Sequence, residues 1–174
     1  IKDVKTMIQA FAFAKKSVPE LKLWIMGPTD EDKAYAQECF DLVKALGVED
    51  VEFTGRVNVK DYLGKMDFTL LTSISEGQPL TILESYAAHK PVIATDVGNC
   101  QELIYGNDDG FGSAGILTHI MNIEEIAQAM ITMTEDQEER ERMGEAGYKR
   151  VNAFYRIEQM KDVYRGIYRE LSDR

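Results

Sequence analysis

Several residue types that mark particular protein classes are scarce in this chain of 174 residues. Its two cysteines, Cys39 and Cys100, are too few for a disulfide framework and lack metal-ligand spacing. No apolar run approaches the roughly 20 residues that span a bilayer. The start IKDVKTMIQAF resembles neither a signal peptide nor a transit peptide. We therefore expect a soluble domain located in the cytoplasm.

Positive charge is also in short supply. The chain has 20 Lys and Arg against 30 Asp and Glu, a formal net charge of -10. Such a surface repels a polyphosphate backbone, so nucleic acid is not an expected partner.

A length of 174 residues with 44% hydrophobic side chains suits one well-filled core. Because the chain begins with Ile1, directly before a predicted helix, we expect it to be part of a longer protein.

Short apolar runs alternate with helical patterns through the first two thirds of the chain. The expected strands are residues 21–26, 51–54, 68–71, 92–95 and 114–117. The expected helices run from Asp3 to before Pro19, from after Pro28 to Gly47, briefly after Asn58, and from Leu80 to His89. This rhythm predicts an α/β fold with a doubly wound, Rossmann-like parallel sheet and helices on both faces.

Three helical segments without strands follow, at 123–133, about 135–151, and 155–171. We expect all three to pack over the sheet. The last carries a single apolar stripe of Ile157, Met160, Val163, Tyr164, Ile167 and Leu171. The aromatic residues around its start are interpreted as core or hinge side chains rather than a ligand platform, namely Tyr148, Phe154 and Tyr155.

Ligands of open parallel sheets bind beyond the carboxyl ends of the strands. Three loops qualify: Gly27-Pro28-Thr29, Gly55-Arg56-Val57, and SISEGQPL at 73–80. In the last loop Pro79 suits the first helical position, and Gly77 lets a ligand approach the backbone. Free N–H groups at that helix start suit a phosphate or diphosphate. An ordinary strand-to-helix turn would carry the same features.

Two glutamates, Glu76 and Glu84, flank the start of this helix. The helical repeat predicts one face with Thr81, Glu84 and Ala88 and a separate apolar face with Leu80, Leu83 and Ala87. Glu84 would then look toward the crevice. A carboxylate accepts hydrogen bonds from neighbouring hydroxyls, so such a pair suits ribose and sugar recognition. Two glutamates at this spacing are also common on solvated surfaces.

The block from Glu76 to Glu84, with KPVIAT, Asp96-Val97-Gly98 and Glu102-Leu103-Ile104 after it, resembles retaining GT-B glycosyltransferases of family 4. LWIMG, VEFTGRV and GILTHIMNIEEIAQAM extend the resemblance over nearly all of the chain. It implies that residues 1–174 are the C-terminal, donor-binding half of a GT-B fold. The enzyme would transfer a hexose from a nucleoside diphosphate sugar to an acceptor hydroxyl, and an N-terminal domain would bind the acceptor. The alternative is a non-catalytic regulatory or assembly module that has the same fold without the ligand.

The resemblance also implies residue roles. The residue matching Glu84 binds the ribose hydroxyls, and the one matching Glu76 lies at the donor sugar. Lys2 matches a lysine on the diphosphate, so Glu76 and Lys2 are the expected catalytic residues; a matching arginine would precede Ile1. Arg56 and Val57 would lie by the base. The expected binding residues are Gly27, Arg56, Val57, Gly77, Gln78, Pro79, Leu80, Thr81 and Glu84.

Gln78 departs from the E-G-F-G or E-G-x-G of most family members. The segments EGQPLTILE and ATDVGNCQELI resemble instead the cytosolic glycosyltransferases of the bacterial Pel exopolysaccharide system, whose donor is UDP-glucose. This finer resemblance implies exopolysaccharide synthesis. The implied partners are the nucleotide sugar, the enzyme's own N-terminal domain and membrane-associated synthesis proteins.

No metal or other cofactor is expected. Asp30-Glu31-Asp32 imitates a D-x-D metal motif, but acids at a helix start complement the helix dipole, so capping is the favoured interpretation. His89 and His119 have no third ligand nearby in sequence, which favours helix-end and loop roles. Cys100 is interpreted as a small buried residue rather than a reactive thiol.

Overall fold

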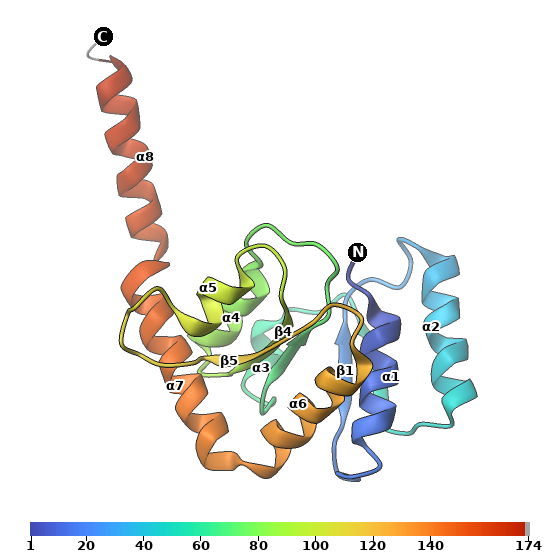
Figure 1. The fold of residues 1–174 in the computed structure, drawn as a ribbon. Coiled ribbons are helices and arrows are strands. Elements are labelled where there is room, and N and C mark those ends of the chain that lie inside the picture. The colour runs from blue at the N-terminus through green and yellow to red at the C-terminus, as the bar shows by residue number, and fades with distance from the viewer. Residues whose placement is uncertain (173–174) are drawn as a thin grey trace.

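A computed structural model of the chain describes residues 1–172. Within them, strands and helices alternate up to β5, and three helices follow (Figure 1). The elements are α1 (Val4–Ala14), β1 (Leu23–Met26), α2 (Lys33–Leu46), β2 (Val51–Gly55), α3 (Lys60–Leu63), β3 (Thr69–Leu71), α4 (Leu80–Ala87), β4 (Val92–Thr95), α5 (Cys100–Tyr105), β5 (Gly115–Thr118), α6 (Ile123–Glu135), α7 (Gln137–Phe154) and α8 (Ile157–Ser172).

Every strand pairing in the described residues is parallel. The predicted α/β fold with parallel strands and flanking helices is confirmed. The strands divide between two sheets, however: β1 pairs with β2, while β3, β4 and β5 form a second sheet in that order. β3 has only three residues and its ladder is made with β4 alone, so no described ladder joins the two sheets.

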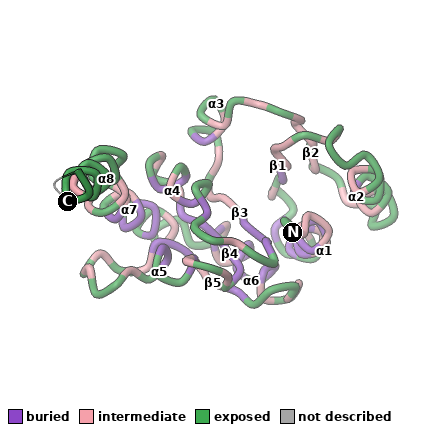
Figure 2. The backbone as a smooth tube through the Cα atoms, turned by 90° about the horizontal axis from the view of Figure 1, so that it is seen from above, coloured by how far each residue is buried: buried purple, intermediate pink, exposed green. Residues whose placement is uncertain are grey.

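The core lies on both faces of β4, whose four residues are all buried. Strand side chains alternate between faces. Ile93 accordingly packs in a cluster with α1 and α6, while Val92 and Ala94 pack with α4 and α5. α7 contributes Met143 to the first cluster and Ala146 to the second. Figure 2 shows the buried residues gathered on β4 and on the helices around it.

One helix was missed by the sequence analysis. α5 has six residues, of which Cys100, Leu103 and Ile104 are fully buried. A segment this short covers less than two turns, so its apolar spacing cannot be told from that of a loop. Its burial against β4 and β5 therefore comes from the tertiary fold.

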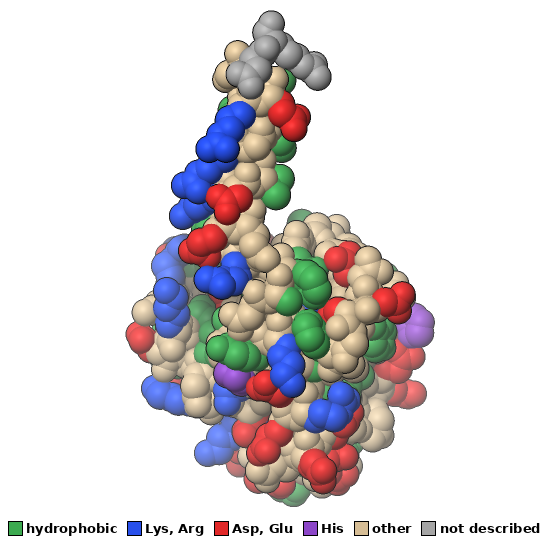
Figure 3. Space-filling model, turned by 90° about the vertical axis from the view of Figure 1, so that its left-hand side faces the viewer, with side chains coloured by type: hydrophobic (Ala, Val, Ile, Leu, Met, Phe, Trp, Pro, Cys, Tyr) green, Lys and Arg blue, Asp and Glu red, His purple; other side chains and the backbone are tan. Residues whose placement is uncertain are grey.

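The prediction that the last helix packs over the sheet is wrong. α8 has no buried residue, and in Figure 1 it stands away from the body of the protein. Its apolar residues, from Ile157 to Leu171, are exposed. Figure 3 shows hydrophobic side chains along one side of α8 and Lys and Arg along another. Both faces of β4 are already covered by other helices, α1 and α6 on one face and α4 and α5 on the other.

Of the three aromatic residues expected in the core or at a hinge, only Tyr155 packs against a core cluster. Tyr148 stacks on His89 with ring centroids 3.7 Å apart. Tyr155 directly follows α7, packs against the second core cluster and donates its hydroxyl to Glu102 at 3.1 Å. Phe154 is exposed.

None of the helices within residues 1–172 is long and apolar enough to cross a bilayer.

Candidate functional site

The segment before α1 lies against the loop that follows β3. The backbone N–H of Ile74 donates to the carbonyl oxygen of Ile1 at 2.8 Å. The buried hydroxyl of Thr72 donates to the carbonyl oxygens of Lys2 and Asp3, each at 3.0 Å. The fold thus joins two segments some 70 residues apart in sequence.

Lys2 and Glu76, the two expected catalytic residues, are in direct contact. Lys2 Nζ donates to Glu76 Oε1 at 2.5 Å, and the hydroxyl of Ser73 donates to the same oxygen at 2.7 Å. Burial raises the pKa of Glu76, but the hydrogen bonds from Lys2 and Ser73 outweigh it, so the pKa lies below its usual value. Glu76 is therefore a carboxylate at neutral pH. The sequence analysis placed Ser73 in this loop without giving it a role.

The loop between β4 and α5 fixes the backbone of Glu76 and Gly77. The N–H of Asn99 donates to the carbonyl oxygen of Gly77 at 2.9 Å. Gly98 has a φ of 54°, and a Cβ there would lie 2.5 Å from the Gly77 carbonyl oxygen and closer still to that of Glu76. Only glycine permits this approach. The resemblance named Gly98, but its packing role became visible only in the structure.

Pro79 directly precedes α4, with φ -73° and ψ 109°, instead of being its first helical residue as predicted. Its extended backbone makes it the cap position, because the first residue with helical geometry is Leu80. No side chain caps this end of α4. The first N–H groups of the helix and the positive end of its dipole are thus open to an anion.

The predicted division of α4 into two faces is partly wrong. Thr81 and Glu84 are exposed as expected, but so are Leu80 and Ala87 from the proposed apolar face. The side that packs on the core consists of Ile82, Ser85 and Tyr86, with Leu83 partly buried. Tyr86 fixes this orientation, because its hydroxyl donates to the carbonyl oxygen of Leu103 at 3.1 Å. Glu84 makes no hydrogen bond or ion pair with any described residue, which leaves its carboxylate available to a ligand.

The loops after β1 and β2 form a second group. The N–H of Gly27 donates to the carbonyl oxygen of Gly55 at 3.0 Å. Arg56 pairs with Glu31 at 2.6 Å between two exposed side chains, and Val57 is partly buried. No hydrogen bond or ion pair within residues 1–172 joins this group to Glu76 or to Glu84. The structure therefore shows direct contacts between Lys2 and Glu76 and, independently, between the loops that carry Gly27 and Arg56.

Asp30-Glu31-Asp32 lies at the start of α2, where capping was expected. Asp32 accepts a hydrogen bond from the N–H of Tyr35 at 3.0 Å, so it is a helix cap as predicted. Glu31 is engaged by Arg56.

The remaining candidate ligands also follow their expected roles. His89 lies just after α4, and His119 contacts Glu125 of α6 at 2.9 Å, which agrees with helix-end and loop positions. Cys100 is fully buried, and burial raises its thiol pKa.

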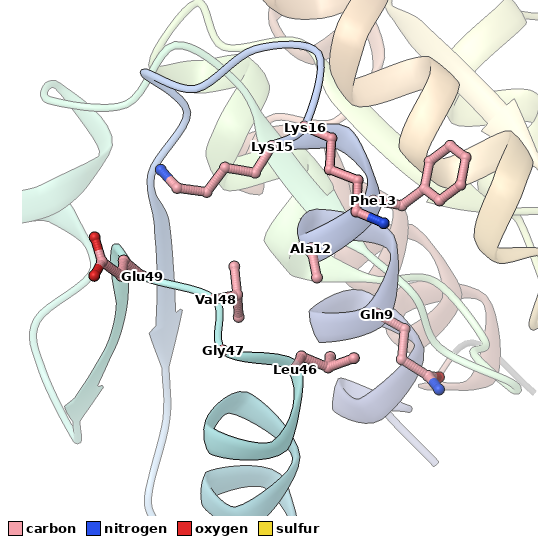
Figure 4. A pocket seen from close by; sticks show the side chains of 9 residues that line it. All are labelled: Gln9, Ala12, Phe13, Lys15, Lys16, Leu46, Gly47, Val48 and Glu49. Atoms are coloured by element: carbon pink, nitrogen blue, oxygen red, sulfur yellow. The ribbon is translucent and has the colours of Figure 1, made fainter.

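A groove of about 520 Å³ lies elsewhere, between the second half of α1 and the turn after α2 (Figure 4). Gly47, Val48 and Glu49 line it and precede β2, so it opens at the amino ends of the strands, away from the loops described above. Lys15 on its edge is bound to Asp50 at 2.7 Å and to two carbonyl oxygens. The groove is therefore separate from the candidate site.

Residues 1–150 match the family described as Glycosyl transferases group 1. The chain belongs to this family. Among similar proteins, the N-acetyl-alpha-D-glucosaminyl L-malate synthase of Bacillus anthracis is 33% identical over 170 residues, which are 97% of this chain and 42% of that protein. The putative glycosyltransferase EpsD of Bacillus subtilis is 28% identical over 94% of this chain and 42% of its own length. The group 1 domain thus spans less than half the length of these relatives.

Solved structures agree at the level of the fold. Anabaena HepE, solved in complex with UDP-glucose, superposes with a TM-score of 0.84 at 21% identity, over 99% of this chain and 46% of that chain. The C-terminal domain of a glycosyl transferase group 1 protein (LpcC) from Francisella tularensis gives a TM-score of 0.77 at 26% identity, over 90% of this chain and 80% of that one. The group 1 domain therefore has the fold of GT-B glycosyltransferases.

Proposed function

We propose that residues 1–174 are the donor-binding, C-terminal half of a retaining glycosyltransferase of family 4, which moves a hexose from a UDP-sugar to an acceptor hydroxyl. The observation that carries this proposal is the pairing of Lys2 with Glu76 beside the uncapped start of α4. This arrangement sets a cation, a carboxylate and open N–H groups beyond the carboxyl end of β3. The UDP-glucose in HepE supports the donor class. The acceptor half belongs to the part of the enzyme outside this chain.

Each group would act on a different part of the donor. Glu84 receives the ribose hydroxyls, Glu76 the hexose, and Lys2 with the α4 N–H groups the diphosphate. Around them the site uses Gly27, Arg56, Val57, Gly77, Gln78, Pro79, Leu80 and Thr81. In the reaction the bond from hexose C1 to the diphosphate oxygen breaks, C1 bonds to the acceptor oxygen, and the proton of the acceptor hydroxyl passes to the departing diphosphate. Lys2 and the oriented N–H groups stabilise the charge on the departing diphosphate.

We further propose that the donor is UDP-glucose, that the product is an exopolysaccharide of the Pel type, and that the enzyme works in the cytoplasm with membrane-associated synthesis proteins. The segments EGQPLTILE and ATDVGNCQELI support this assignment. The diphosphate is proposed to bind without a metal ion. In support, Asp32 is engaged as a helix cap and Glu31 is paired with Arg56.

Calorimetry of UDP binding tests the ribose assignment. A hydrogen bond to a charged group contributes about 1.5–3 kcal/mol, so Glu84→Ala is expected to weaken UDP binding by roughly tenfold or more. Glu20→Ala removes an exposed carboxylate outside the candidate site and is the matched control. It should bind UDP as the wild type does. Equal affinity of the Glu84→Ala and Glu20→Ala variants would contradict the assignment.

A further inference from the structure

Ser73 lies at the centre of the contacts that hold Glu76. Its side chain is fully buried, and its hydroxyl donates to Glu76 Oε1 at 2.7 Å. Its carbonyl oxygen in turn accepts a hydrogen bond from the hydroxyl of Thr95 at 2.5 Å. Thr95 is the last residue of β4 and is also fully buried. Ser73 is thus anchored to the central strand of its sheet.

Lys2 contacts the same oxygen from a less restrained position. Its side chain is 62% exposed, whereas that of Glu76 is 13% exposed. An ion pair with one partner in solvent contributes little to holding a geometry, because a long exposed side chain retains its rotational freedom. Since Lys2 and Ser73 both donate to Oε1, the oxygen Oε2 receives no donor from residues 1–172. The carboxylate therefore has one oxygen fixed by protein and one open.

The Lys2 ammonium cannot bind Glu76 and a diphosphate equally strongly. A diphosphate carries more negative charge than one carboxylate, so it attracts the Lys2 ammonium more strongly. An exposed, flexible ammonium can follow that attraction. When it does, the hydroxyl of Ser73 is the remaining protein donor on Oε1.

We propose that Ser73 is the positioning residue for the donor-sugar carboxylate: it keeps Glu76 oriented when Lys2 turns to the diphosphate of the donor. This inference rests on the proposed function. Ser73 does not touch the donor and acts only through Glu76. Its contribution is therefore specific to the sugar part of the ligand, since UDP alone has no group at Glu76.

Calorimetry with UDP and UDP-glucose tests the proposal through the ratio of the two affinities. Ser73→Ala should lower the affinity for UDP-glucose relative to UDP by about fivefold, the size expected for loss of one ordinary hydrogen bond. Ser85→Ala is the matched control, because Ser85 is equally buried and its hydroxyl bonds Thr69 at 2.6 Å, on the core side of α4. That variant should leave the ratio unchanged. A lower stability of Ser73→Ala does not invalidate the test, because both affinities in the ratio are measured on the same variant.

The double variant separates action through Glu76 from general damage. In a Glu76→Gln background, Ser73→Ala should change the ratio no further. Carboxyl NMR provides a second readout, in which Ser73→Ala should raise the pKa of Glu76 and Ser85→Ala should not. If wild type binds neither ligand, the proposed function fails. If both ligands bind and Ser73→Ala leaves the ratio unchanged, or lowers it equally in the Glu76→Gln background, the role of Ser73 is refuted.

Discussion

Arg150 and Asp109 form a buried ion pair. Their side chains are 1% and 4% exposed, and Arg150 Nε donates to Asp109 Oδ2 at 2.5 Å. The other guanidinium nitrogens donate to Asp109 Oδ1 and to the carbonyl oxygens of Leu103, Ile104 and Gly112. The hydrogen bond from Arg150 holds the pKa of Asp109 below its usual range. Through this one side chain, α7 is bound to α5 and to the loop before β5.

Replacing Arg150 should strongly destabilise the fold. Arg150→Met would leave the Asp109 carboxylate buried without its partner and the carbonyl oxygen of Gly112 without its donor. The carbonyl oxygens of Leu103 and Ile104 would keep one donor each, the Tyr86 hydroxyl and the Ala114 N–H. Removing one member of a buried pair costs about 3–5 kcal/mol. The neighbouring Lys149→Met removes only a surface contact to Glu145 at 3.7 Å and should cost less than about 1 kcal/mol. Urea unfolding at neutral pH gives both values, and equal losses in the two variants would contradict this account.

The sequence could not have revealed this pair. Asp109 and Arg150 are 41 residues apart, one in the loop before β5 and one on α7. Helical spacing predicts which residues share a face of a helix, but it does not predict which charged residue of another element forms an ion pair with them. The contact between Lys2 and Glu76 differs, because the resemblance assigned both to one ligand before the structure joined them.

At the scale of elements, α8 shows that an amphipathic pattern predicts a helix but not the surface against which the helix packs. The spacing of its apolar residues predicted the helix almost to its ends, at 155–171 against the observed Ile157–Ser172. An amphipathic period states that one face is apolar, yet it does not name the surface which that face covers. The same limit explains the faces of α4, where Tyr86 and Ile82 decided the orientation and Leu80 was left exposed.

Deleting α8 should hardly change the stability of the remaining domain. Because none of its residues is buried, its removal exposes almost no core. A chain ending at Arg156 should unfold within about 3 °C of the full chain, which corresponds to less than roughly 1 kcal/mol. Differential scanning calorimetry of the two chains measures the shift. A drop in unfolding temperature well beyond this range would contradict the prediction, because α8 would then make stabilising contacts that the structure does not show.

For the whole molecule, the alternation of short apolar runs and helical patterns was enough to predict the fold class and the succession of the strands along the chain. It could not predict that the strands divide between two sheets, because ladder formation depends on local geometry such as the three-residue length of β3. The candidate site was proposed from the resemblance together with the rule for parallel sheets. What neither supplied is how the site is held, by Ser73, Thr95 and the close approach of Gly98.

An NMR titration of the isotope-labelled chain with UDP tests whether this domain binds a nucleotide sugar, because it reports binding and its location together. We expect saturable shifts of the amide signals of Gly77, Leu80 and Thr81 at the start of α4. The amides of Gly47 and Val48 in the groove of Figure 4 should stay unchanged. Saturable shifts confined to that groove, or no shifts at millimolar UDP, would contradict the assignment of this domain as a nucleotide-sugar-binding half.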